Sequence, residues 1–338
     1  MGGPGCRSGR PGTIRKKRNS MRIKLWGVRG SLPTPLTSDN VETKIRRALS
    51  LAKPGDISSE EAIDSFVRSL PVSVRSTFGG NTTSIQVTTS SGDIIILDCG
   101  SGLRAMGMEM MKGDFGKGRG TANIFLSHTH WDHIQGIPFF VPMYIRGNRF
   151  NFYSAFKDLK QRLDHQQVFS HFPVTFDYLQ STKEFFTIES EEELFLNDAR
   201  VLNKVMPHPG GAYGFRIEDR GAVMVYTSDC EFNINEIDHI EKYRAFFSDA
   251  DVVIFDTQYT FEEAISKFEF GHSSATIAID IAGMFNVRRL LLFHHEPNYD
   301  DDKLENVLVN ARTYMGMNPR RVGDLEIDIA SEGMEIEL

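Results

Sequence analysis

The order of hydrophobic and polar positions predicts alternating strands and helices over most of the chain. Short β-branched or aromatic runs bounded by Gly, Pro, Asn or Ser are typical of strands, and apolar residues three and four positions apart are typical of helices. Strands are predicted at 22–26, 84–89, 93–98, 124–126, 201–206, 213–217, 222–226, 252–255, 289–293 and 325–329. Helices are predicted after Gly102, at 273–284 and at 302–315. Because strands and helices alternate in both halves, we expect an α/β protein in which two sheets pack together with helices outside.

Two segments depart from this pattern. Residues 38–70 have the spacing of two short helices, separated by Lys53-Pro54-Gly55, and are expected to be an insertion. Residues 1–20 hold six basic residues, no acidic residue and no apolar stretch, which favours a disordered basic extension over a secretory signal. No linker rich in Pro, Gly or Ser divides residues 21–338, so we expect them to form a single domain.

Composition narrows the class of protein. With 338 residues, 40% of them hydrophobic, the chain can bury a large core, which excludes a disordered protein and a coiled coil. No apolar run approaches the length of a membrane span, so we expect no membrane association. The cysteines Cys6, Cys99 and Cys230 form no CxxC pair, which argues against a disulfide framework and a thiolate zinc site. A reducing, cytoplasmic location is therefore expected.

The net charge of −7 conceals an uneven distribution. Without the six basic residues of 1–20, the 38 Lys and Arg fall to 32 against 45 Asp and Glu, which leaves −13 on the remainder. Proteins bind long nucleic acids largely through Lys and Arg that displace counterions. We therefore do not expect a long nucleic acid as partner.

One short run carries the candidate chemistry. Ser127-His128-Thr129-His130-Trp131-Asp132-His133 places four potential metal ligands within six residues, directly after an apolar strand. Imidazole nitrogen and carboxylate oxygen suit zinc, and also manganese or iron. Side chains two apart in an extended chain point the same way, so His128 and His130 can face one ion while Asp132 and His133 face a second. A polar surface loop would not explain why three of the ten histidines fall here.

This run resembles the HxHxDH signature of metallo-β-lactamase-fold hydrolases, and the resemblance extends over residues 21–338. The chain is most similar to the phosphodiesterase branch, which includes tRNase Z and cyclic phosphodiesterases. The matching motifs include Trp26-Gly-Val-Arg-Gly-Ser31, Gly79-Gly-Asn-Thr82, Leu97-Asp98-Cys-Gly-Ser-Gly, Pro207-His208-Pro209, Thr227-Ser-Asp229, Gly271-His272-Ser273 and Phe293-His294-His295. The resemblance implies a four-layer αββα sandwich of two mixed sheets.

The resemblance also implies a site for two divalent metal ions, with zinc expected and manganese or iron as alternatives. One ion would be held by His128, His130 and His208, the other by Asp132, His133 and His294, with Asp229 between them. Further residues are expected around the ligands or facing the substrate: Asp98, His295, Trp131 and Arg104. Arg29 and Arg104 are candidates for holding a second phosphate, or for buried ion pairs.

In the phosphodiesterase branch, a Gly-His-Ser motif supplies a histidine that contacts the scissile phosphate. His272 matches it, and Asp256 matches its acidic partner. An imidazolium held by Asp256 would neutralise phosphate charge and donate a proton to the leaving group. We therefore predict His272, Asp256 and Asp132 as catalytic residues of a metal-dependent phosphodiesterase, in which a hydroxide between the metals cleaves a small nucleotide-like or cyclic phosphate ester.

Three other functions stay open. A tRNA 3′-processing endoribonuclease would resemble its family in carrying a Gly- and Pro-rich arm, and Cys230–Phe255 contains none. A hydrolase of carbon esters, thioesters or lactones would not need the Asp256–His272 pair. A sensor or adaptor would hold a ligand without cleaving it. The 38–70 insertion is expected either to cover the site as a lid or to form a contact in a homodimer.

Overall fold

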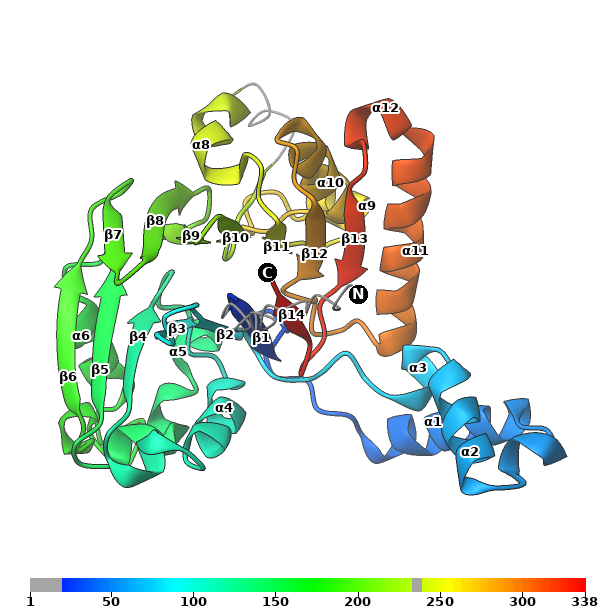
Figure 1. The fold of residues 1–338 in the computed structure, drawn as a ribbon, viewed down its shortest axis with the longest axis horizontal. Helices are drawn as coiled ribbons and strands as arrows, with labels where there is room; N and C mark the ends of the chain where they lie inside the picture. The colour runs from blue at the N-terminus through cyan, green and yellow to red at the C-terminus, as the bar shows by residue number, and fades with distance from the viewer. Residues whose placement is uncertain (1–19, 233–238) are drawn as a thin grey trace, which may run out of the picture.

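The computed structural model of this chain describes residues 20–232 and 239–338, so most of the predicted basic extension lies outside the described residues. Two seven-stranded sheets face one another (Figure 1). The first has the order β14-β1-β2-β3-β4-β5-β6, with bounds β1 Arg22–Gly27, β2 Ser84–Thr88, β3 Ile94–Leu97, β4 Thr121–Phe125, β5 Arg149–Ser154, β6 Thr182–Thr187 and β14 Glu335–Glu337. The second has the order β13-β12-β11-β10-β9-β8-β7, with bounds β7 Glu193–Leu196, β8 Ala199–Met206, β9 Ala212–Asp219, β10 Ala222–Tyr226, β11 Val252–Asp256, β12 Arg289–Phe293 and β13 Glu326–Ile329.

Helices cover the outer face of each sheet. The first sheet is covered by α4 (Leu103–Met110) and α6 (Leu159–Gln166), and the second by α8 (Arg244–Phe247), α10 (Ala275–Met284), α11 (Asp301–Met317) and α12 (Pro319–Val322). The remaining helices are α1 (Ser38–Leu51), α2 (Glu60–Ser69), α3 (Val72–Arg75), α5 (Trp131–Ile134) and α9 (Phe261–Ser266). The 3₁₀ helices are η1 (Pro54–Ile57), η2 (Asp114–Lys117), η3 (Ile137–Phe139), η4 (Val141–Tyr144), η5 (Phe176–Tyr178) and η6 (Ile240–Tyr243).

Three buried clusters hold these layers together. The cluster between the sheets includes Leu25, Ile85, Leu97, Phe125, Phe215, Tyr226 and Phe293. Outside the first sheet, Ile96, Ile124 and Phe152 pack against Leu103, Met106 and Leu163. Outside the second sheet, Val253, Phe255 and Leu292 pack against Ile277, Ile281 and Leu304. Because strand side chains alternate between faces, the central strands carry apolar residues on both sides. The predicted four-layer α/β sandwich is confirmed.

Four of the observed strands were not predicted from the sequence pattern. β5, β6, β7 and β14 are present but were not predicted. β6, β7 and β14 lie at sheet edges, and the exposed Phe186 of β6 and Phe195 of β7 break the alternation of buried apolar and exposed polar positions. β5 lies inside the first sheet and does alternate between buried and less buried positions. Among the described residues no helix is both long enough and apolar enough to cross a membrane.

Residues 38–70 form α1, η1 and α2, which project from the sandwich at the lower right of Figure 1. Thr37 caps α1, because its side chain accepts a hydrogen bond from the backbone N–H of Asn40 at 3.2 Å. Between Cys230 and Phe255, the described residues form η6, α8 and most of β11, and 233–238 lie outside the description.

Candidate metal centre

The candidate ligands meet at one end of the sandwich, because they follow strands that run in the same direction. β3 and β4 are parallel in the first sheet, and β10, β11 and β12 are parallel in the second. The carboxyl ends of parallel strands share an edge of a sheet, where ligand sites usually form. The loops after β4, β8, β10 and β12 carry the predicted ligands, and they converge although they are far apart in sequence.

The first group combines three histidines with one aspartate: His128, His130, His208 and Asp229, whose ligand atoms lie within 4.8 Å of one another. His128 Nε2 lies 3.6 Å and His208 Nε2 lies 4.0 Å from Asp229 Oδ2. His130 Nδ1 lies 3.2 Å from His208 Nε2. These are the donor types and the number of donors that a tetrahedral zinc site uses.

The second group shares Asp229 with the first and adds Asp132, His133 and His294. Asp229 Oδ1 lies 3.1 Å from both His133 Nε2 and His294 Nε2. Asp132 Oδ2 lies 3.3 Å from His133 Nε2 and 3.2 Å from His294 Nε2. The two oxygens of Asp229 thus face different groups, which is the arrangement required of a carboxylate between two ions.

Each of four histidines has one ring nitrogen held by the protein while the other faces the ligand groups. The held Nδ1 atoms contact Ser127 Oγ at 3.0 Å for His128, Asp98 Oδ2 at 2.8 Å for His133, the Gly271 carbonyl at 2.9 Å for His208, and Gln258 Oε1 at 2.9 Å for His294. Such contacts fix the tautomer and the orientation of metal-binding histidines. Gln258 was not predicted from the sequence, although its place two residues after Asp256 at a strand end was a usable signal.

Asp98 organises the ligand loop from beneath. Its carboxylate accepts hydrogen bonds from the backbone N–H of Ser127 at 2.8 Å, the Ser127 hydroxyl at 2.7 Å and the Tyr226 hydroxyl at 2.6 Å, besides its contact with His133. The side chains of Asp98 and His133 are fully buried. This is the position around the ligands that the resemblance implied for Asp98.

The protonation states of the site suit metal binding. Burial lowers the pKa of His128 well below its ordinary value, and burial also lowers the pKa of His130 and His208, so these rings are neutral. Burial opposes a charge on Asp229, but His133 and His294 hold the pKa of its carboxyl well below the usual range. The carboxylates of Asp229, Asp132 and Asp98 outweigh burial and raise the pKa of His133 well above its ordinary value, so a metal ion at that ring would displace a proton. Neutral imidazoles and ionised carboxylates are the forms that bind metal ions.

Three buried atoms of the site have no hydrogen-bond partner: His128 Nε2, His133 Nε2 and Asp229 Oδ1. Buried polar atoms without partners are costly and rare in native proteins. All three belong to the ligand groups and are turned towards the other ligand atoms. Divalent ions would satisfy these atoms, so the residues present fit a site for metal ions.

The predicted catalytic pair lies beside the second group. His272 Nδ1 lies 2.8 Å from Asp256 Oδ2, and these two residues form a third cluster with Asp229 and His294 within 4.8 Å. Burial lowers the pKa of His272, but the Asp256 carboxylate outweighs burial and raises that pKa to about 9. His272 is therefore an imidazolium at neutral pH, held at the edge of the ligand groups.

Other predicted residues take different places. Trp131 lies between two ligands on α5 and is 85% exposed, so its ring does not pack beneath the ligand loop. His295 is buried, and its Nε2 lies 2.8 Å from the Ala330 carbonyl, so the structure does not bring its ring to the ligand groups. Arg104 is exposed on α4 and belongs to none of the ligand groups. Arg29 is buried and donates to the carbonyls of Gly79, Glu296 and Tyr299, so it supports loops rather than holding a phosphate.

Sequence reasoning missed residues that hold the site loops. Glu231 accepts hydrogen bonds from the backbone N–H of Glu269 at 2.9 Å and of Gly271 at 2.8 Å, and so fixes the loop before His272. The backbone N–H of Ser31 donates to Asp132 Oδ2 at 2.8 Å. Arg162 donates to Thr129 Oγ1 at 3.1 Å, between two ligand histidines. Such charged and polar residues are common in loops, and only the fold shows their partners.

Comparison with protein families gives one match over more than half of the chain. The family described as the beta-lactamase superfamily domain matches residues 94–295. The matched segment includes every residue of both ligand groups and the Asp256–His272 pair.

Curated relatives with similar sequences carry the name Ribonuclease Z. The protein of Thermoplasma acidophilum is 26% identical over 236 residues, which cover 56% of this chain and 73% of that protein. The protein of Metallosphaera sedula is 26% identical over 266 residues, covering 66% and 85%. That of Prochlorococcus marinus is 33% identical over 149 residues, and the match spans less than half of each chain, 42% in both.

Solved structures share the fold. The metallo-beta-lactamase fold protein YhfI from Bacillus subtilis superimposes with a TM-score of 0.61 at 18% identity, over 95% of this chain and 100% of that one. A diphosphatase of the PhnP family gives a TM-score of 0.58 at 16% identity, over 94% and 98%. Human tRNase Z, short form, gives a TM-score of 0.56 at 16% identity, over 93% and 98%. At these identities the likeness shows the fold alone.

Proposed function

We propose that this chain, which belongs to the beta-lactamase superfamily and is a hydrolase of that superfamily, is a metal-dependent phosphodiesterase. The observation that carries the proposal is the Asp256–His272 pair, 2.8 Å apart and in one cluster with the ligands Asp229 and His294. A buried imidazolium beside a metal site suits an anionic substrate whose leaving group needs a proton. A carbon ester or lactone carries no such negative charge, so an imidazolium at this place would do less for its hydrolysis.

The proposed metals are two divalent ions, with zinc first and manganese or iron as alternatives. His128, His130 and His208 would hold one, Asp132, His133 and His294 the other, and Asp229 would contact both. Bound there, the ions would stabilise negative charge on the phosphoryl oxygens and make a water molecule more acidic. Asp132 is held for this role by the backbone N–H of Ser31.

His272 has two roles in the proposed reaction. Its Nδ1–H is directed to Asp256, which leaves Nε2–H free to donate to the substrate. Its positive charge offsets the phosphate charge, and its proton goes to the departing oxygen. Asp256 is itself fixed, because its carboxylate accepts from the backbone N–H of Cys230 at 3.0 Å and of Gln258 at 3.1 Å.

The proposed substrate is a small nucleotide-like or cyclic phosphate ester. The exposed ring of Trp131, flanked by His130 and Asp132, offers a flat surface on which a base or sugar can pack. Between Cys230 and Phe255 the described residues form only η6, α8 and most of β11, with 233–238 outside the description, and the loop between β9 and β10 is only residues 220–221, so the described residues contain no projecting arm in either place. The segment that does project, 38–70, has six acidic residues (Asp39, Glu42, Asp56, Glu60, Glu61, Asp64) and five basic ones (Lys44, Arg46, Arg47, Lys53, Arg68), a balance unsuited to gripping RNA.

The second candidate is tRNA 3′ processing, favoured by the three relatives named Ribonuclease Z. Precursor tRNA and 2′,3′-cyclic or 3′,5′-cyclic nucleotides, offered to one preparation, separate the two candidates. We expect a higher kcat/KM for a cyclic nucleotide. Cleavage of precursor tRNA with a higher kcat/KM would reverse the order.

The decisive experiment measures metal content and turnover of bis(p-nitrophenyl) phosphate for the wild type, His272→Ala and Asp132→Ala. We expect two metals per chain in the wild type, diester cleavage, and loss of turnover in both variants. His165→Ala is the matched control, because His165 is an exposed histidine on α6 outside the ligand groups. Two metals without diester cleavage would refute the proposal and favour a hydrolase of thioesters or lactones. Unhydrolysed nucleotide bound to the purified protein would instead favour a sensor.

A further inference from the structure

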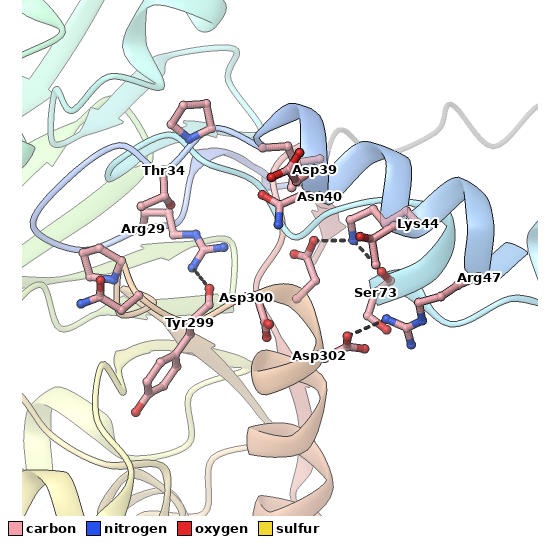
Figure 2. Close-up of a pocket in the computed structure, with 16 residues that line it drawn as sticks. Arg29, Thr34, Asp39, Asn40, Lys44, Arg47, Ser73, Tyr299, Asp300 and Asp302 are labelled. Atoms are coloured by element: carbon pink, nitrogen blue, oxygen red, sulfur yellow. Dashed lines mark hydrogen bonds and ion pairs between the residues drawn. The ribbon is translucent and has the colours of Figure 1, made fainter.

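The pocket between α1 and α11 contains three cationic side chains, and the protein itself engages all of them (Figure 2). Lys44 Nζ lies 2.7 Å from Asp301 Oδ2, and Arg47 Nη1 lies 2.6 Å from Asp302 Oδ2. Arg29 donates hydrogen bonds to three backbone carbonyls. This pocket of about 420 Å³ therefore offers no unpaired positive charge to an anionic ligand.

Lys267 differs from these cations because it has no acidic partner. It directly follows α9, lies five residues before His272 and is only partly exposed. No described carboxylate lies within salt-bridge distance of its ammonium group. Charged side chains that are partly removed from water are usually paired. The Lys267 ammonium group is therefore available to an anionic ligand.

The ammonium group of Lys267 packs on an aromatic ring beside the proposed catalytic histidine. Its Nζ lies 4.1 Å from the centre of the Tyr259 ring, which is a distance typical of cation–π contacts. The Tyr259 ring in turn meets the His272 imidazole edge to face, with ring centres 5.5 Å apart. The two distances place the ammonium group within about 10 Å of the His272 ring.

The backbone that carries Lys267 and Tyr259 is joined to the metal centre by hydrogen bonds. The backbone N–H of Tyr259 donates to the carbonyl of Ser273, the residue after His272, at 3.2 Å. The segment that begins at Lys267 ends at Gly271, whose carbonyl holds a ligand histidine at 2.9 Å. Lys267 and Tyr259 therefore keep a fixed place relative to the proposed reaction centre.

The carboxylates around Tyr259 do not neutralise Lys267. Burial, and then these nearby carboxylates, raise the pKa of Tyr259, so its hydroxyl stays protonated and uncharged. The carboxylates have partners of their own: Asp256 contacts His272, Glu296 accepts from the Asn298 side chain, and Glu263 accepts from the backbone N–H of Thr260. An anionic group bound here would meet their repulsion, and Lys267 is placed to offset it.

We propose that Lys267, held on the Tyr259 ring, determines specificity by binding a second phosphate group carried by the leaving group of the substrate. This inference rests on the proposed phosphodiesterase function, in which His272 gives its proton to the departing oxygen. Because Tyr259 lies beside His272, Lys267 is on the leaving-group side. In a nucleoside 2′,3′-cyclic phosphate, the ribose that carries the departing oxygen also carries the 5′ position. We therefore expect a preference for the 5′-phosphorylated form.

The first test compares kcat/KM for a nucleoside 2′,3′-cyclic phosphate with and without a 5′-phosphate. The wild type should prefer the 5′-phosphorylated substrate, and Lys267→Gln should lower the ratio of the two values about tenfold, because a charge pair is lost. Lys267→Arg keeps the charge and should keep most of the preference. Lys303→Gln is the matched control, because Lys303 Nζ also lies over a tyrosine ring, at 5.1 Å, but on α11, and its ratio should equal that of the wild type. An unchanged ratio in Lys267→Gln, or an equal loss for both substrates, would overturn the proposal.

The second test measures binding and does not require turnover. Isothermal titration of the metal-loaded protein with adenosine 3′,5′-bisphosphate and adenosine 3′-monophosphate should give the lower Kd for the bisphosphate. In Lys267→Gln the two Kd values should be nearly equal. Tighter binding of the bisphosphate without cleavage of either cyclic substrate would refute the proposed function but support the phosphate site at Lys267. Equal Kd values in the wild type would refute that site even if both cyclic substrates are cleaved.

Discussion

The Asp256–His272 pair gives the proposed reaction a pH dependence that can be worked out from the structure. Asp256→Asn keeps the size of the side chain and removes its charge. The Asp256 carboxylate, 2.8 Å from His272 Nδ1, overcomes burial and raises the pKa of His272 to about 9. A raised pKa keeps the ring protonated through neutral pH, and the protonated form is lost as the pH rises through about 9.

The size of the effect follows from the two protonation equilibria. In Asp256→Asn we expect the pKa of His272 to fall towards its ordinary 6.5, because burial remains and the nearest carboxylate is gone, while Asp229 and Asp132 still favour the charged ring. A full return to 6.5 would lower the protonated fraction at pH 8 from about 0.9 to about 0.03, so kcat/KM should fall by up to about 30-fold. At pH 5.5 both forms are largely protonated, so the loss through protonation stays within about twofold.

The assay is the pH profile of kcat/KM for a cyclic nucleotide, whose ribose leaving group needs a proton. Metal content is measured for each variant, because Asp256 Oδ1 also lies 3.8 Å from the ligand His294. Asp64→Asn, an exposed change on α2, should leave the profile unaltered. An equal loss for Asp256→Asn at pH 5.5 and pH 8 would refute the reasoning, because the carboxylate would then act on structure and not on protonation.

Three further perturbations test the supports of the site. Asp98→Asn should weaken metal affinity about 10- to 100-fold in competition with a chelator, because an amide cannot accept hydrogen bonds from all the groups that donate to Asp98. An unchanged metal affinity would contradict this role of Asp98. Removing metal with a chelator should lower the melting temperature in calorimetry, since buried ligand atoms lose their partner, and an unchanged value would argue against bound ions. Glu231→Gln should lower kcat several-fold with metals retained, because one of two carboxylate acceptors for the loop before His272 is lost, and a kcat equal to the wild type would exclude a positioning role.

Most internal strands, though not β5, were predicted from the sequence, because strands buried on both faces consist largely of apolar residues. The prediction at 289–293 matches β12 and that at 222–226 matches β10, both of which are central and largely buried. The missed strands β6 and β7 lie at sheet edges, where one side contacts water and the exposed Phe186 and Phe195 break the alternation of apolar and polar positions. The burial that makes a strand readable in sequence is absent there.

The ligand residues were predictable to different extents. The run from His128 to His133 could be read from residue types alone, because four donors follow one buried strand. His208, Asp229 and His294 are isolated in sequence and were expected only through the resemblance. The contacts that hold them, such as Gln258 on His294, depend on the register of β11 against β12, which no local pattern specifies.

The backbone conformation at the strand ends explains why local sequence preferences predict the structure least well next to the site. Asp98, Ser228 and His294 have φ values of 58°, 57° and 61°, a left-handed conformation that side chains other than glycine rarely adopt. Each costs about 1 kcal/mol or more, and such strain persists where the surrounding structure overrides local preference. His294 is a predicted ligand, Asp98 holds the predicted ligand His133, and Ser228 directly precedes the predicted ligand Asp229. A glycine would relax each turn, but at Asp98 and His294 it would also remove the side chain that the site uses. At these positions the residue type therefore suits the site and not the local backbone conformation, which would favour glycine.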